Sequence, residues 1–139
     1  MTEALKDIGS AAYQALKNKV PDLDSRAILS QVQFCIKENC INKGEYFVAD
    51  LVLVKEVDDG FGGKVLDVVI VDTKLSATTN LTPNQKVADG LGALKIKSFS
   101  GSSINGRTIP EDFSSGNTVV KNGKILKMYN DSSGSVEVK

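Results

Sequence analysis

Two aspartates and a lysine stand within two strongly apolar segments of the chain. Asp50 lies in the segment 46–57 (YFVADLVLVKEV), and Asp72 and Lys74 lie in the segment 64–75 (KVLDVVIVDTKL). Carboxylates among apolar neighbours repel one another and are costly to keep ionised, and a divalent cation removes both costs. We therefore predict a Mg²⁺ or Mn²⁺ site, with Zn²⁺ as an alternative. Lys74 would stabilise the charge of a phosphoryl transition state or position the attacking water.

A hairpin of two long strands would bring these groups together. Side chains alternate between the faces of a strand, so Asp72 and Lys74 share one face. If the turn is centred near residues 60–62, the numbers of paired residues sum to about 122, and Asp50 lies opposite Asp72. The backbone carbonyl of Thr73 is then a natural extra metal ligand. The alternative interpretation is that both acids mark strand ends or face solvent, with Lys74 as a surface ion-pair partner.

The remaining elements predict one mixed α/β (α+β) domain of 139 residues. Apolar residues at three-to-four spacing favour a first helix over 4–16, capped by Thr2, and a second over 24–36. Thr82 and Pro83 indicate the N-terminus of a further helix. We expect a helical part (1–44), a catalytic core (45–99) ending with a strand over 93–99, and a loop followed by a C-terminal β-hairpin around Asn122-Gly123 with an edge strand in the tail (100–139).

Composition excludes several classes of protein. The chain contains no histidine, which removes Ser-His-Asp, Cys-His and His-based ribonuclease chemistry. No segment approaches the roughly 20 apolar residues of a membrane span. The formal net charge is zero, so nucleic-acid binding would need lysines gathered on one face. Cys35 and Cys40, five residues apart, are expected to be free thiols, with a disulfide as the alternative.

The order of these motifs resembles that of a known superfamily. Ala49-Asp50, a hairpin and then Val69-Ile70-Val71-Asp72-Thr73-Lys74 resemble the signature of the PD-(D/E)xK nucleases, over roughly residues 45–97. That superfamily includes restriction endonucleases, resolvases and bacterial toxin nucleases. The resemblance implies a restriction-endonuclease-like core, with Asp50 as the lone acid and Asp72 and Lys74 as the D/E-x-K pair. Ala49 replaces the proline that is frequent in the family.

The segment 72–85, with Asn80-Leu81-Thr82-Pro83-Asn84-Gln85 after the Asp-x-Lys strand, is similar to C-terminal toxin modules of polymorphic and contact-dependent growth inhibition systems. This resemblance implies a DNase toxin domain of a larger secreted effector that acts in the cytoplasm of a target bacterial cell. It also implies a cognate immunity protein as partner. DNA is slightly favoured over RNA, and a tRNA-cleaving toxin is the alternative. A non-enzymatic binding or immunity-type module is the other class, favoured if the acids lie on opposite faces.

Further residues are candidates for supporting roles. Gln85, in the first turn of the helix after the Asp-x-Lys strand, would orient the water or touch a phosphate. An additional acid in the metal shell is expected from one of three residues: Glu3, Asp7 or Glu45. The candidates for binding the nucleic-acid backbone are Lys86, Lys95 and Lys97.

Overall fold

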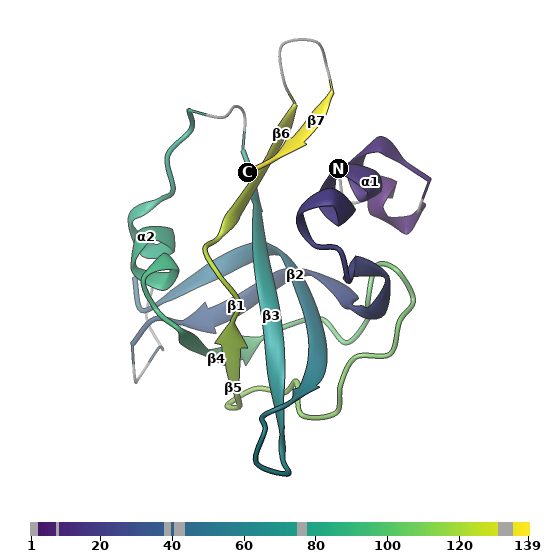
Figure 1. Ribbon diagram of the computed structural model, residues 1–139. Coiled ribbons are helices and arrows are strands. Elements are labelled where there is room, and N and C mark those ends of the chain that lie inside the picture. The colour runs from purple at the N-terminus through teal and green to yellow at the C-terminus, as the bar shows by residue number, and fades with distance from the viewer. Residues whose placement is uncertain (1–2, 8, 38–39, 41–43, 75–77, 131–134) are drawn as a thin grey trace.

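The computed structural model describes residues 3–7, 9–37, 40, 44–74, 78–130 and 135–139, although not the side chains of residues 3–4 (Figure 1). The helical elements are η1 (Glu3–Lys6), α1 (Ala11–Lys19), η2 (Leu23–Ser25) and α2 (Pro83–Asp89). The strands are β1 (Ala27–Cys35), β2 (Tyr46–Asp58), β3 (Lys64–Thr73), β4 (Ala93–Ser98), β5 (Thr118–Lys121), β6 (Leu126–Asn130) and β7 (Val136–Val138). The domain is mixed α+β, and in the described ranges no helix is long and apolar enough to cross a membrane.

Five strands close into a barrel. Their order is β2-β1-β4-β5-β3, and the pairing of β3 with β2 joins the two ends. Every pair is antiparallel except β3–β5, which is parallel. Strand β6 continues beyond β5 along the same edge of β3 and pairs with β7, which forms an edge strand as predicted. The end of β3, from Val71 to Thr73, is therefore paired with β6 instead of β5.

Apolar residues fill the barrel and also cover part of its outside. One buried cluster lies within the barrel and includes Val52, Val54, Val68 and Ile70. The alternate residues of the same two strands point outward into a second buried cluster, to which α1 contributes Ala12, Tyr13 and Leu16. Each fully buried aliphatic side chain contributes about 1.5–3 kcal/mol. This double burial explains why both strands are apolar on both faces. Figure 1 shows α1 and α2 on opposite sides of β3.

The second predicted helix is wrong, because residues 27–35 form β1. The inner face of β1 carries Ala27 and Leu29, and then Val32 and Phe34. Between Leu29 and Val32 the alternation slips by one residue at Gln31, whose φ of 55° is unusual for a residue other than glycine. Inward residues are two positions apart along the rest of β1, but three positions apart between Leu29 and Val32, and this one longer interval resembles the spacing of apolar residues on a helix. The predicted helical part (1–44) thus contains a barrel strand.

Two other boundaries differ from expectation. The first predicted helix is split into η1 and α1, and α1 begins after the N-cap Ser10, whose side chain accepts a hydrogen bond from Tyr13 N; the expected cap Thr2 lies outside the described residues. The prediction of a hairpin around Asn122-Gly123 is wrong. Strands β5 and β6 both run parallel to β3, and Asn122 N donates to Val68 O. The dipeptide therefore connects two strands that follow one another along the same edge of β3. The C-terminal hairpin is formed instead by β6 and β7.

Candidate active site

The β2–β3 hairpin has the predicted register. Leu51 pairs with Val71 and Asp58 with Lys64, so the paired numbers sum to 122. Beyond Leu51 the ladder stops, and the Asp50 carboxylate takes the place of the next backbone acceptor. Its Oδ2 accepts hydrogen bonds from the N–H and the hydroxyl of Thr73, both at 2.9 Å. Strand β2 therefore diverges from β3 at Asp50, and the carboxylate lies in the fork.

The other edge of β3 is held through the same residues. Asp72 pairs with Lys127 and Thr73 with Met128 of β6, and Lys74 N donates to Met128 O at 2.9 Å. The end of β3 is thus bound on one side by a backbone ladder and on the other by the Asp50 side chain. This places Asp72 and Lys74 on a rigid element, as a catalytic constellation requires.

Asp50 also lies where the alternation of inward and outward side chains is interrupted in two paired strands. In β2 the inward residues are Phe47 and Ala49 before this point and Val52 and Val54 after it. In β1 the same interruption occurs at Gln31. The register is the same on both sides of this point, with Val32 opposite Ala49 and Ser30 opposite Leu51. Gln31 Nε2 lies 3.4 Å from Asp50 Oδ1 as donor. Gln31 was not predicted as a site residue, because its only signal in the sequence is an interrupted alternation of apolar residues that was interpreted as a helix.

Lys74 connects Asp72 to α2. Its Nζ lies 2.6 Å from Asp72 Oδ2 and donates to Gln85 Oε1 at 3.0 Å. The predicted N-cap Thr82 is confirmed: it accepts from Gln85 N, while Gln85 Oε1 accepts from Thr82 N at 2.8 Å. This capping box fixes the Gln85 amide, and Gln85 in turn fixes the Lys74 ammonium. Asp72 and Gln85 are buried, at 4% and 7% exposed.

The pKa values of the two aspartates are shifted in opposite directions. Burial opposes ionisation of Asp50, but hydrogen bonds from Asp72, Thr73 and Gln31 outweigh it, so the pKa of Asp50 is lowered. Burial and the hydrogen bond with Asp50 raise the pKa of Asp72, and Lys74 offsets this only in part. Asp50 therefore ionises more readily than Asp72, as expected for two carboxyl groups in contact.

These groups fit a divalent cation. Asp72 Oδ2 is buried and accepts no hydrogen bond of good geometry, although it contacts the Lys74 ammonium. Asp50 and Asp72 would hold such a cation, and its charge would offset the repulsion between their carboxylates. In the part of the chain that the structure describes, no three His, Cys, Asp or Glu residues cluster. Asp50, Asp72 and the Thr73 carbonyl would leave positions for water and phosphate, the usual arrangement for Mg²⁺.

Two of the three expected additional acids, Asp7 and Glu45, do not join this pair. Asp7 is exposed and accepts a hydrogen bond from Gly9 N. Glu45 precedes β2, five residues from Asp50, which corresponds to about 16 Å along an extended strand. The side chain of Glu3 lies outside the described part of the structure. Of the candidate basic residues, Lys86 and Lys95 are exposed and Lys97 is half-buried.

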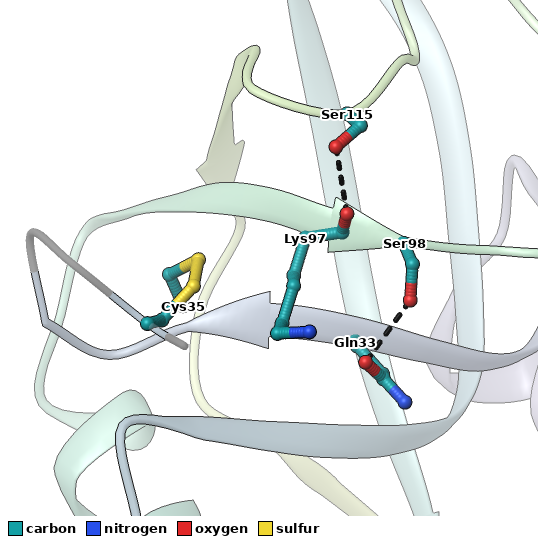
Figure 2. Close-up of a disulfide and its surroundings, with 6 residues drawn as sticks. Gln33, Cys35, Lys97, Ser98 and Ser115 are labelled. Carbon is teal, nitrogen blue, oxygen red and sulfur yellow. Dashed lines mark hydrogen bonds between the residues drawn. A yellow bond between two sulfur atoms is a disulfide. The ribbon is translucent and has the colours of Figure 1, made fainter. Parts of the chain in front are cut away.

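Cys35 and Cys40 form a disulfide, so the expectation of free thiols is wrong (Figure 2). The expectation assumed a helix, in which residues five apart point to different sides. Cys35 instead ends β1, and the chain that follows returns Cys40 to a Cα–Cα distance of 5.4 Å, within the normal range for disulfides. The cross-link closes the connection between β1 and β2.

Comparison of the chain with protein-family models, with curated proteins and with solved structures finds no match. The functional assignment therefore rests on the geometry around Asp50 and Asp72 and on the motif resemblance.

Proposed function

We propose that this protein is a metal-dependent endonuclease that hydrolyses phosphodiester bonds. The observation that carries the proposal is the convergence of Asp50, Asp72, Lys74 and Gln85 at the fork between β2 and β3. A structural ion pair would not need a buried and a half-buried acid in contact, because their mutual repulsion is destabilising.

Each residue has a role that follows from its position. Asp50 and Asp72, with the Thr73 carbonyl, would hold a Mg²⁺ or Mn²⁺ ion, which supplies Lewis-acid polarisation of the phosphate and lowers the pKa of bound water. The Lys74 side chain is 9% exposed and lies beside Asp72, where its ammonium would position the attacking water or stabilise the charge that develops on the phosphate. Gln85 is a positioning residue, because it accepts a hydrogen bond from Lys74 Nζ.

The elements around the motif follow the order expected of a restriction-endonuclease-like core, although the sheet closes into a barrel rather than the predicted open central sheet. Strands β1, β2 and β3 form an antiparallel meander, the Asp-x-Lys motif ends β3, and α2 follows. With the motif resemblance, this favours the DNase toxin domain of a bacterial competition effector, delivered into the cytoplasm of a target cell and neutralised by an immunity protein. A tRNA-cleaving toxin of the same fold is the alternative.

The test is a cleavage assay on plasmid DNA, single-stranded DNA and total tRNA, each with Mg²⁺, Mn²⁺, Zn²⁺ or EDTA. We expect metal-dependent cleavage that is lost in Asp72→Asn and in Lys74→Met. The matched control is the pair Asp58 and Lys64, an exposed acid and lysine 3.9 Å apart at the other end of the same hairpin. Asp58→Asn and Lys64→Met should retain cleavage.

The substrate that is cut distinguishes a DNase from an RNase. Absence of cleavage with every metal and substrate, by wild-type protein with an intact cooperative unfolding transition, would overturn the proposal. Equal loss of cleavage in the control variants would also overturn it, because the activity would then not depend on the fork.

A further inference from the structure

Three neighbouring strands, β1, β2 and β4, form an outer face close to the candidate active site. Its side chains are uncharged or basic. In the first part of β2, Phe47 and Ala49 point into the barrel, which turns Tyr46 and Val48 outward. Tyr46 pairs with Cys35 of β1, and Cys35 pairs with Lys95 of β4, so these residues form one cross-strand row. Lys97 follows Lys95 on the same side of β4. Val48 is 36% exposed.

The side chains on this face are held in place. Lys97 Nζ lies 4.7 Å from the centroid of the Tyr46 ring, a cation–π distance. Figure 2 shows the Lys97 side chain reaching across β1 beside Gln33, with the disulfide at the end of the same strand. Gln33 accepts a hydrogen bond from Ser98, and Ser115 donates to the Lys97 carbonyl at 2.7 Å. The face is therefore a preformed surface.

A cleft joins this face to the candidate active site. It has a volume of about 390 Å³ and is lined by Gly44, Tyr46, Phe47, Val48, Thr82, Asn84 and Gln85. Asn84 Nδ2 donates to Tyr46 O at 3.0 Å, which fixes the first turn of α2 against β2. Gln85 belongs both to the cleft and to the active site, since its Oε1 contacts Lys74 Nζ. A group bound in the cleft would thus lie next to the scissile phosphate.

The charge of this face is complementary to phosphate. The strand segments that form it, 31–35, 46–49 and 93–98, contain two lysines and no aspartate or glutamate. An aromatic ring flanked by lysines is the combination that binds single strands, because the ring stacks on any base and the lysines contact the backbone. A base in a duplex is already stacked and paired, so it would have to be extruded before it could enter the cleft.

We propose that this face and its cleft bind an unpaired nucleic-acid strand, with a base stacked on Tyr46 and with Lys95 and Lys97 on its phosphates. This inference rests on the proposed nuclease function and specifies its substrate as a single-stranded or looped region. The strand then runs from β4 across Tyr46 to the phosphodiester at Asp50 and Asp72. Stacking of one base contributes about 1–3 kcal/mol, so loss of the Tyr46 ring should weaken binding about 5- to 150-fold.

The test measures binding in EDTA, where the proposed nuclease is inactive. Fluorescence anisotropy would follow labelled single-stranded DNA and RNA of about 16 nucleotides, and the matching duplexes. We expect tighter binding of single strands than of duplexes, about 5- to 150-fold weaker binding by Tyr46→Leu, and near wild-type binding by Tyr46→Phe, which keeps the ring. Phe61→Leu is the matched control, since Phe61 is 94% exposed in the turn of the β2–β3 hairpin.

The outcomes separate this inference from the proposed function. If metal-dependent cleavage occurs but Tyr46→Leu binds single strands as tightly as the wild type, or duplexes bind as tightly as single strands, the inference is overturned and the nuclease stands. If Tyr46-dependent binding of single strands occurs without cleavage by any metal, the nuclease proposal fails and the binding face stands. A loss of binding equal in Tyr46→Phe and Tyr46→Leu would exclude stacking and also overturn the inference.

Discussion

Arg26 offers a quantitative test of what holds β2 and β3 together. It is the largest fully buried side chain of the described residues, at 1% exposed. Its Nη1 donates to the carbonyls of Leu53 on β2 and Asp67 on β3, both at 3.0 Å. Its Nη2 lies 3.3 Å from Asp67 Oδ1, and its Nε donates to Asp22 at 3.0 Å. Arg26 therefore clamps β2 to β3, the strands that carry Asp50 and Asp72.

The substitution Arg26→Met should be strongly destabilising. Methionine replaces part of the aliphatic volume but leaves two carbonyls without this donor and the Asp67 carboxylate, 18% exposed, without its ion-pair partner. Removing one member of a buried ion pair costs about 3–5 kcal/mol. The Asp22 carboxylate is 36% exposed, so its contact adds little. We expect a loss of about 4 kcal/mol in the free energy of unfolding, which lowers Tm by about 12 °C.

Urea unfolding followed by circular dichroism would measure this loss for the wild type, Arg26→Met and Asp22→Asn. Asp22→Asn is the matched control, because it removes the exposed partner of the same guanidinium, and it should cost less than about 1 kcal/mol. A cost below about 1 kcal/mol for Arg26→Met, or an equal cost for both variants, would refute the reasoning that the buried contacts dominate.

Three further measurements follow from the structure. Burial and the hydrogen bond with Asp50 raise the pKa of Asp72, so in EDTA the wild type loses stability as pH rises through that raised pKa. The unfolding free energy of Asp72→Asn relative to wild type should therefore increase as pH rises above about 4, the ordinary pKa of an aspartate, and a constant difference in urea titrations would contradict this. Thr82→Ala removes the N-cap of α2 and should cost about 1 kcal/mol in thermal unfolding, whereas Thr82→Ser, which keeps the hydroxyl, should be nearly neutral. Reduction of the disulfide should lower stability by about 2 kcal/mol through the short loop that it closes, and unchanged urea midpoints with and without dithiothreitol would argue against it.

The strongest sequence predictions concern elements with local signals. The β2–β3 hairpin has the register expected from its glycine-rich turn, since Leu51 pairs with Val71. The helix after β3 begins at the predicted cap Thr82, with Pro83 in its first turn. In both cases a few adjacent residues determine the geometry, through turn conformation or through backbone capping.

The errors occur where distant contacts override a local pattern. β1 was interpreted as a helix because its change of face at Gln31 imitates helical spacing, and that change is stable only opposite the matching change at Asp50 of β2. Asn122-Gly123 was interpreted as a hairpin turn, but the strands on either side of it find their partner in β3. Neither pairing can be derived from the residues of the segment itself.

The sequence by itself determined that Asp72 and Lys74 share a face and that the β2–β3 hairpin has a register in which paired numbers sum to 122, because strand periodicity and one hairpin turn suffice for that. Tertiary structure alone decided that β2 leaves β3 at Asp50, that Thr73 donates to its carboxylate, and that Gln85 accepts from Lys74. These contacts join residues 11 to 23 positions apart. They depend on the barrel, which fixes the strands and α2 relative to one another, so the opposite pKa shifts of the two acids are a property of the fold.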